Sequence, residues 1–392
     1  MKQETVSASV ADFFGLAAAT RLRGWLGGGR YVELDRVLGG GESGAKVACL
    51  YFEDRVGGDH QKFVVKLSRR RAEIERARQA WETAGAFQRH LAEMVDVIDV
   101  GDGSALAVQR VGGDDLGEFV PLSALELDTV AQTGARVVGT MLTRWRPGPA
   151  SACADMSVRQ FMTLMLGERV AEGGKVHRWA TEQGLLHGRH PLGGPFTLLD
   201  PQGLGGRRLR GIHLGPAHRD LHLGNILVRR SPGLPREWIL IDLDRFGPAA
   251  PRAGDGAHLL LCVLARELPA LGEELRVALI EALAEGETAP GALPPQVVRL
   301  IRRFGEEWAG WLAGKGLGEE WAVHRRLALV AAALMFVGRA RHQDDGTWLW
   351  FLRLAARVTG VLTEKWTARD ATPREHRGPG GLAWERLRAE LA

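Results

Sequence analysis

The stretch "HRDLHLGNILV", residues 218–228, places an aspartate and an asparagine five positions apart where a turn enters an apolar segment. In phosphoryl transfer, a carboxylate such as Asp220 can accept the proton of the attacking hydroxyl. An amide oxygen such as that of Asn225 can hold the metal ion that neutralises the phosphates. The alternative is a capped turn, because Asp and Asn are common in loops, where their side chains bond to nearby backbone. The stretch therefore predicts a phosphoryl-transfer loop only if the rest of the chain supplies the other parts.

The first further requirement is a second metal-binding carboxylate, and Asp242 in "ILIDLD" (residues 239–244) can provide it. Residues 226–240 read as a strand, a turn and a strand, so Asp242 should return beside Asn225. Carboxylate and amide oxygens are suitable ligands for Mg²⁺. The next two charged residues, Asp244 and Arg245, are interpreted as a structural ion pair.

The second requirement is a glycine-rich turn that lets backbone amides approach the phosphates closely. Residues 39–44, "GGGESG", match G-x-G-x-x-G, and Gly39, Gly41, Ser43 and Gly44 are the predicted nucleotide contacts. A flexible hairpin would give the same letters. The turn lies between two predicted strands, whereas a dinucleotide-binding fingerprint passes from a strand to a helix, so the Rossmann alternative is disfavoured.

The third requirement is a lysine on the following strand that pairs with the α and β phosphates, and Lys66 in "FVVKL" fits it. Its alternative is an exposed lysine on an edge strand. Such a lysine needs an acidic partner on the next helix, where Glu73, Glu75 and Glu82 occur. Glu75 is the preferred candidate, with Glu82 close behind; the choice among the three stays open.

Apolar patterning predicts an α+β fold with a small antiparallel-sheet lobe followed by a mostly helical lobe. A helix is expected over residues 5–27, and residues 173–216, rich in Gly, Pro, His and Arg, are expected to form an irregular excursion. Asp255, which precedes an apolar helix, is interpreted as a helix N-cap. Strands are expected within residues 31–40, 45–54, 62–70, 94–100 and 104–111, with a helix over 72–92. The expected domains are an N-terminal helical extension (1–30), an N-lobe (31–113), a helical C-lobe (114–366) and a tail (367–392).

The composition narrows the classes of function. The chain has 392 residues, and 51 basic against 47 acidic residues give a formal net charge of +4, too mild to indicate nucleic-acid binding. Cys49, Cys153 and Cys262 lack disulfide or zinc-ligand spacing, which favours a reducing, cytoplasmic setting. The longest apolar run, 327–337, is shorter than the roughly 20 residues of a membrane-spanning helix. No integral membrane segment is expected.

The motifs together resemble the protein-kinase-like superfamily, nearer its aminoglycoside and choline phosphotransferase branch than eukaryotic protein kinases. That branch carries H-G-D-x-H-x-x-N, which His218, Asp220, His222 and Asn225 match, while Arg219 replaces the glycine. Four sequence segments are also similar to those of bacterial ternary-complex-associated phosphotransferase-like domains: "LGGGESGAKV", "FVVKL", "AVQRVGG" and "AHRDLHLGNILV". This similarity spans residues 35 to about 260. No D-F-G or A-P-E motif is present, so an activation loop controlled by phosphorylation is not expected.

The resemblance implies a bilobal kinase fold that binds ATP and Mg²⁺. It implies that Asp220 is the base, that Asn225 and Asp242 are the metal ligands, and that Lys66 is the phosphate clamp. The residues beside Asp220 complete the implied site: Arg219 and His222 join the catalytic set, and His218 supports the loop.

Three functions fit this pattern. The first is an ATP-dependent phosphotransferase that acts on a hydroxyl of a small molecule or sugar. The second is a nucleotide-binding pseudokinase or signalling module of a bacterial effector system, with a signalling protein as its partner. The third is a lipopolysaccharide-core sugar kinase, since "LIDLDR" resembles the metal-binding strand of that family. For this third function Arg207, Arg208 and Arg210 would form a basic patch that faces the membrane. The same arginines could hold an anionic acceptor, and a solvated loop is the favoured interpretation.

Overall fold

The computed structural model describes residues 6–27, 30–38, 45–54, 60–111, 119–145, 153–186, 194–230, 237–286, 291–313, 315, 318–338 and 347–371. The chain divides into two compact units. The first comprises Met1–Leu125 and Leu223–Gly247, and the second comprises Glu126–His222 and Pro248–Ala392. This division differs from the expected domains, because the N-terminal extension and the segment that carries Asn225 and Asp242 both join the sheet-containing unit.

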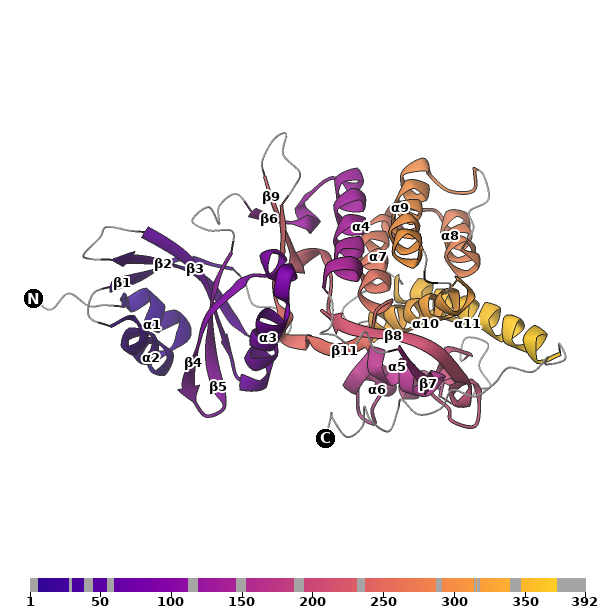
Figure 1. Ribbon diagram of the computed structural model, residues 1–392, viewed down its shortest axis with the longest axis horizontal. Helices are drawn as coiled ribbons and strands as arrows, with labels where there is room; N and C mark the ends of the chain where they lie inside the picture. The colour runs from indigo at the N-terminus through magenta and orange to yellow at the C-terminus, as the bar shows by residue number, and fades with distance from the viewer. Residues whose placement is uncertain are drawn as a thin grey trace, which may run out of the picture. The chain divides into compact units, whose positions relative to one another are not determined.

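The first unit is built on a five-stranded antiparallel sheet (Figure 1). Its strand order is β1-β2-β3-β5-β4. All four neighbouring pairs are antiparallel, as the sequence predicts. The strands are β1 (Arg30–Val37), β2 (Lys46–Asp54), β3 (His60–Ser68), β4 (Glu93–Gly101) and β5 (Ser104–Arg110).

One face of this sheet is covered by two N-terminal helices, α1 (Ala8–Phe14) and α2 (Leu16–Leu26). The predicted single helix is divided by Gly15, whose φ of 96° suits glycine and ends the first helix. Apolar side chains of both helices pack with Val65 of β3 and Val108 of β5 in one buried cluster. The N-terminal extension is therefore part of the core of the first unit.

Successive side chains of a strand point to opposite faces, so Val64 and Lys66 lie on the other face from Val65. That face meets α3 (Arg71–Thr83), whose Ile74 packs on β5, and a small second sheet. Ile239 of the second sheet packs in a cluster with Val64. The second sheet has the order β10-β9-β6, with β6 (Phe119–Pro121), β9 (Ile226–Arg229) and β10 (Trp238–Leu240).

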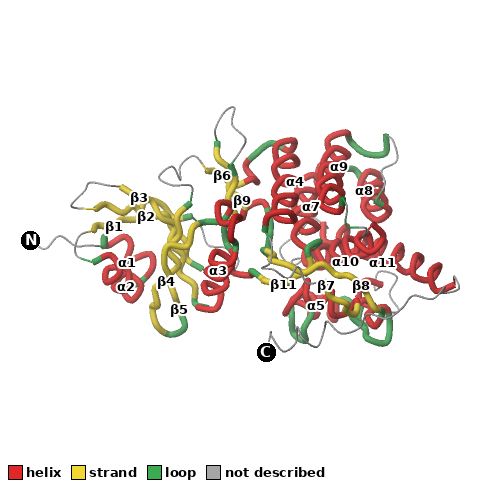
Figure 2. The backbone as a smooth tube through the Cα atoms, viewed as in Figure 1, coloured by secondary structure: helices red, strands yellow, loops and turns green. Residues whose placement is uncertain are grey.

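The second unit is mostly helical (Figure 2). Its central helix α10 is buried around most of its circumference, which its nearly continuous apolar sequence from Leu327 to Val337 requires. It packs against α5, α7 and α11. The helices are α4 (Leu127–Arg144), α5 (Val158–Leu166), α6 (Lys175–Glu182), α7 (Gly254–Glu267), α8 (Glu273–Glu285), α9 (Pro295–Leu312), α10 (Gly318–Val337) and α11 (Thr347–Ala371). These two architectures confirm the predicted α+β class.

The expectation of an irregular excursion over residues 173–216 is wrong in its first part, where α6 lies, and in its last part. Strand β8 (Arg208–Ala217) pairs antiparallel with β7 (Cys153–Ser157), and β11 (Gly247–Pro251) completes the sheet. Gly211, at a φ of 61°, lies opposite a shift of register in β7. Its amide donates to Asp155 Oδ1 at 3.1 Å. Part of the glycine and arginine content of this segment, including Arg208, Arg210 and Gly211, belongs to a bulged strand.

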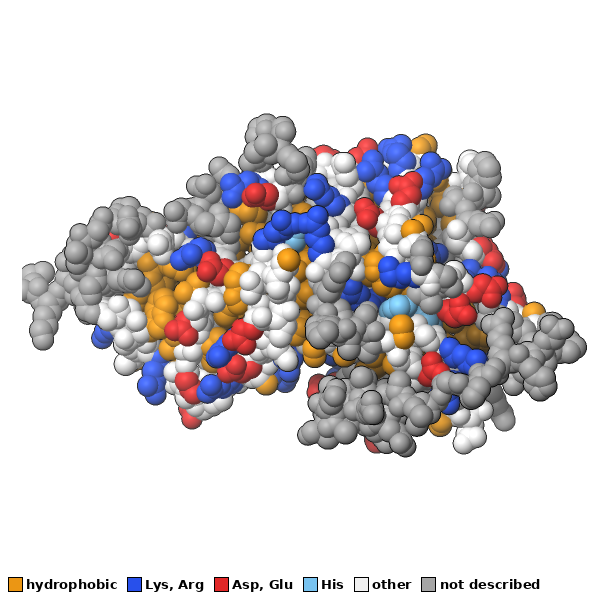
Figure 3. Space-filling view, in the orientation of Figure 1, with side chains coloured by type: hydrophobic (Ala, Val, Ile, Leu, Met, Phe, Trp, Pro, Cys, Tyr) orange, Lys and Arg blue, Asp and Glu red, His pale blue; other side chains and the backbone are white. Residues whose placement is uncertain are grey.

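Acidic and basic side chains both occur over each unit on the face shown in Figure 3. Within the described part of the chain, no helix has the length and apolar composition needed to cross a membrane.

Candidate active site

Lys66 is the centre of a charged cluster in the first unit. Its ammonium group donates to Asp242 Oδ1 at 2.5 Å and to Asp244 Oδ2 at 2.5 Å. The residue is 8% exposed. Because side chains alternate along β3, the Lys66 side chain lies on the face that meets the small second sheet. Both aspartates follow the last strand of that sheet, β10, in the sequence. The alternative of an exposed edge lysine is therefore wrong, and so is the predicted pairing of Asp244 with Arg245.

The electrostatics of this cluster depend on burial and on the two carboxylates. Burial opposes the charge of Lys66, but attraction to Asp242 and Asp244 outweighs it and raises the lysine pKa. Burial also raises the pKa of Asp244, while Lys66 acts in the opposite direction. Asp242 is more open, with 40% of its side chain exposed against 13% for Asp244. The cluster therefore has one solvent-accessible carboxylate and one that depends on the lysine.

The hairpin of β9 and β10 brings Asp242 back to Asn225, as the sequence predicts. Leu240 pairs with Ile226, and the Ile241 amide donates to the Asn225 carbonyl at 3.0 Å. Asp242 then adopts left-handed backbone angles, φ 60° and ψ 56°. Such angles are uncommon outside glycine and often occur at functional positions.

The predicted partner of Lys66 on helix α3 requires correction, because the lysine contacts aspartates instead of a glutamate. Glu75 pairs with Arg71 at 3.1 Å on the exposed side of the helix. Glu82 pairs with Arg78 at 2.8 Å, and Glu73 accepts from the Ser68 hydroxyl at 2.8 Å. These three glutamates therefore have other partners in the structure.

Helix α3 still contacts the aspartate segment, through an arginine that no sequence motif marks. Arg76 Nε donates to the backbone carbonyl of Asp244 at 2.6 Å. This bond fixes the turn that follows Asp242. An unremarkable arginine in a charged helix gives no signal that would distinguish it from its neighbours.

The candidate catalytic loop begins in the second unit, where Asp255 of helix α7 holds its backbone. The His218 amide donates to Asp255 Oδ2 at 2.7 Å, and the Arg219 amide donates to Oδ1 at 2.8 Å. Burial raises the pKa of the Asp255 carboxyl, opposed by His218 and by these two bonds. The predicted N-cap role is wrong: Asp255 lies inside the first turn of α7 and binds a segment 36 residues earlier.

Arg219 contributes a second attachment of the loop. Its Nη2 donates to the Leu164 carbonyl at 2.9 Å, near the end of helix α5. That helix begins at a capping box in which Ser157 and Gln160 exchange hydrogen bonds. Arg219 has a φ of 64°, a backbone conformation that a glycine adopts without strain. This contact gives Arg219 a role in holding the loop.

The other predicted residues of the loop differ in burial. His218 is fully buried, whereas Asp220 and His222 are half-buried. Asp220 belongs to the second unit, and the buried Asn225 belongs to the first.

The predicted glycine-rich turn, with Gly39, Gly41, Ser43 and Gly44, lies outside the described residues. The two strands on either side are described: β1 ends at Val37 and β2 begins at Lys46.

Asp242 and Asn225 carry side-chain oxygens of the kind that suits a hard cation. Asp242 supplies carboxylate oxygens and Asn225 an amide oxygen, the ligands that Mg²⁺ accepts together with substrate phosphates and water. No group of three or more His, Cys, Asp or Glu side chains that could hold a metal ion occurs among the residues that the structure describes. Magnesium held by one or two side chains and by phosphates does not require such a group.

No family model matches the sequence, and neither does any curated protein. Several solved structures are similar. A thermostable mutant of aminoglycoside phosphotransferase APH(4)-Ia, in ternary complex with AMP-PNP and hygromycin B, has a TM-score of 0.49 at 14% identity, over 91% of this chain and 98% of that one. An aminoglycoside-3'-phosphotransferase of type VIII has a TM-score of 0.43 at 20% identity, over 79% of this chain and 96% of that one. A glucosamine kinase in complex with glucosamine, ADP and inorganic phosphate has a TM-score of 0.43 at 15% identity, over 93% of this chain and 89% of that one.

The first two of these structures bear the name of the aminoglycoside phosphotransferases.

Proposed function

We propose that the protein is an ATP-dependent phosphotransferase that moves the γ-phosphate of ATP to a hydroxyl of a small molecule or sugar. The observation that carries this proposal is the bond between Lys66 and Asp242. The two residues are 176 positions apart, and separate sequence motifs predict Lys66 as the phosphate clamp and Asp242 as the metal ligand. If Lys66 were an ordinary surface lysine and Asp242 part of a simple turn, no contact between the two would be expected.

The residues divide the chemistry as follows. Lys66 binds α- and β-phosphate oxygens. Asp242 and Asn225 would hold Mg²⁺, which would offset phosphate charge when bound. Asp220 orients the acceptor hydroxyl and takes its proton. The acceptor oxygen forms a bond to the γ-phosphorus while the bond from that phosphorus to the leaving oxygen of ADP breaks. Asp255 and Arg219 hold the backbone on which Asp220 is carried.

Binding and transfer can be tested separately. Calorimetry should detect binding of ATP with Mg²⁺ to the wild type, and Lys66→Met and Asp242→Ala should each weaken it at least about tenfold, because charge-assisted contacts are lost. Asp220→Asn should keep the affinity for ATP. It should reduce transfer of labelled γ-phosphate to a panel of amino sugars and neutral sugars by about a hundredfold or more.

Asp128→Ala is the matched control for removal of an aspartate, since Asp128 forms an exposed pair with Arg299. Equal ATP affinity in wild type, Lys66→Met and Asp242→Ala would contradict the proposal. Tight binding with no transfer to any acceptor, and the same slow hydrolysis in Asp220→Asn, would favour a nucleotide-binding module instead.

A further inference from the structure

A second concave site lies wholly within the helical unit. It is a cavity of about 570 Å³ between helices α7, α8, α9 and α10. Its size falls within the roughly 300–1,000 Å³ of typical small-molecule sites. None of the described residues that line it belongs to the catalytic-loop segment or to the Lys66 cluster. The cavity therefore needs an explanation of its own.

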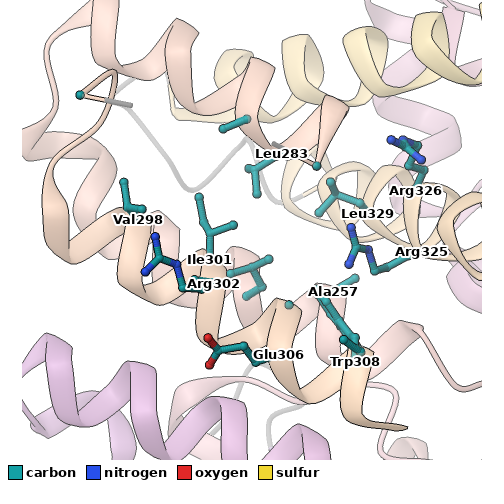
Figure 4. Close-up of a pocket in the computed structure, with 16 residues that line it drawn as sticks. Ala257, Leu283, Val298, Ile301, Arg302, Glu306, Trp308, Arg325, Arg326 and Leu329 are labelled. Atoms are coloured by element: carbon teal, nitrogen blue, oxygen red, sulfur yellow. The ribbon is translucent and has the colours of Figure 1, made fainter. Parts of the chain in front are cut away.

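The walls of this cavity are largely apolar (Figure 4). Leu283 of α8, Ile301 of α9 and Leu329 of α10 face the space from three helices, and Ala257 and Leu260 come from α7. Ala257 of α7 and Gly286, which directly follows α8, add little side-chain volume to the lining. An occupant of the cavity would thus contact hydrocarbon over most of its surface.

The charged lining is mainly basic. Arg302 of α9 and two consecutive arginines of α10, Arg325 and Arg326, line the cavity, against a single lining acid among the described residues, Glu306. Figure 4 shows Arg325 beside Leu329 on one side of the cavity and Arg302 on the other. An anion would balance this excess of positive charge.

The two arginines of α10 differ in how their charges are satisfied. Arg326 donates to the Ala284 carbonyl at 2.9 Å and to the Glu285 carbonyl at 2.8 Å, at the end of α8. Arg325 lies over the Trp308 ring at 4.9 Å, and no carboxylate pairs with it among the described residues. Burial and the neighbouring Arg326 lower the pKa of Arg325. Its guanidinium is thus a half-buried cation whose hydrogen-bonding capacity is available to a ligand.

We propose that this cavity binds a small organic anion, with an apolar body against Leu283, Ile301 and Leu329 and a carboxylate or phosphate group on Arg325. A guanidinium forms paired hydrogen bonds with either group. The bonds are strengthened by the apolar surroundings, and the anion relieves the repulsion between the two adjacent arginines.

The probe for the test is 8-anilinonaphthalene-1-sulfonate, an apolar ring system with one anionic group whose fluorescence rises on binding. Octanoate, octyl phosphate and the uncharged octyl glucoside are then titrated as competitors against the folded, full-length protein. Octanoate or octyl phosphate should displace the probe, and octyl glucoside should be at least about tenfold weaker, since it lacks the charge-assisted bond. The stronger of the two anions identifies the preferred head group.

Two variants locate this binding. Arg325→Gln should weaken the anionic competitor by about tenfold or more and leave octyl glucoside unchanged. Ala309→Trp, at an exposed lining position on α9, should fill the opening and exclude the probe and every competitor. Arg303→Gln, on the same helix but outside the lining, is the matched control and should behave as wild type.

Thermal unfolding and far-ultraviolet circular dichroism verify that each variant is folded. Equal displacement by octyl glucoside and by the anions would overturn the proposal. Unchanged affinity of the anions in either Arg325→Gln or Ala309→Trp would overturn it as well.

Discussion

Two aspartates with largely buried side chains, one in each unit, are held by different kinds of partner. Burial raises the pKa of both Asp244 and Asp255. Asp244 is stabilised by the Lys66 ammonium at 2.5 Å, whereas Asp255 accepts two backbone amides of the candidate catalytic loop. A lysine side chain can rotate toward another anion, but a backbone amide can leave only if the loop moves. The Lys66 cluster is therefore suited to exchange partners, and the Asp255 contact is suited to hold a loop in one conformation.

The largest effect is expected for Asp255→Ala, because it leaves the His218 and Arg219 amides without their acceptor. Each buried donor left unsatisfied costs about 1–3 kcal/mol, so the free energy of unfolding should fall by roughly 4 kcal/mol. Urea denaturation measures this change. Asp128→Ala, which removes an exposed aspartate, should alter stability by less than about 1 kcal/mol. An equal loss of unfolding free energy in Asp255→Ala and Asp128→Ala would show that the two amide hydrogen bonds to Asp255 do not stabilise the fold.

Lys66→Met should have the next largest effect, about 2 kcal/mol at neutral pH, because Asp244 stays buried without its cation. Loss of the lysine raises the Asp244 pKa further above its ordinary value of 3.8. The folded state then binds the proton more tightly than the unfolded chain, so this destabilisation is small near pH 4 and grows as the pH rises. Urea denaturation of both proteins between pH 4 and pH 7 tests the trend. A difference that does not depend on pH would show that Asp244 does not rely on Lys66.

A smaller effect is expected at Arg219, whose positive φ and bond to Leu164 can be separated by two substitutions. Arg219→Ala loses the bond and keeps the backbone strain, whereas Arg219→Gly loses the bond and relieves the strain. The glycine variant should therefore be more stable than the alanine variant by about 1 kcal/mol. Thermal unfolding compares them, and a more stable alanine variant would refute the strained conformation.

The smallest effect is expected for Glu75→Gln, since the Glu75 pairs with Arg71 and Arg78 are largely exposed. Stability should change by less than about 0.5 kcal/mol. The affinity for ATP should also stay within about twofold, because Lys66 pairs with aspartates. Calorimetry decides the point: a clear loss of ATP affinity would restore Glu75 as the partner of the lysine.

The sequence predicts the five strands of the first sheet well because alternating apolar residues record which face of a strand is buried. It also predicts the return of Asp242 to Asn225, since a short hairpin leaves few alternatives. The sequence does not predict strand β8, because its glycines and arginines resemble a loop and its partner β7 lies more than 50 residues earlier. Local patterns carry no information about such distant pairings.

Similar reasoning explains the errors within the candidate site. Asp255 at the beginning of a helix resembles an N-cap, and Asp244 beside Arg245 resembles an ion pair. Both interpretations consider only neighbours in the sequence. The actual partners are 36 and 178 residues away, and only the folded chain brings them together.

Two carboxylates and one ammonium give the Lys66 cluster one net negative charge. Such a cluster would repel a nucleotide that arrives without a counter-ion. Under the proposed function, a divalent cation on Asp242 reverses the sign of the cluster and competes with Lys66 for the carboxylate. The lysine is then available to the phosphates. Cation and nucleotide should consequently bind with positive cooperativity, and each should raise the apparent affinity of the other by the same factor.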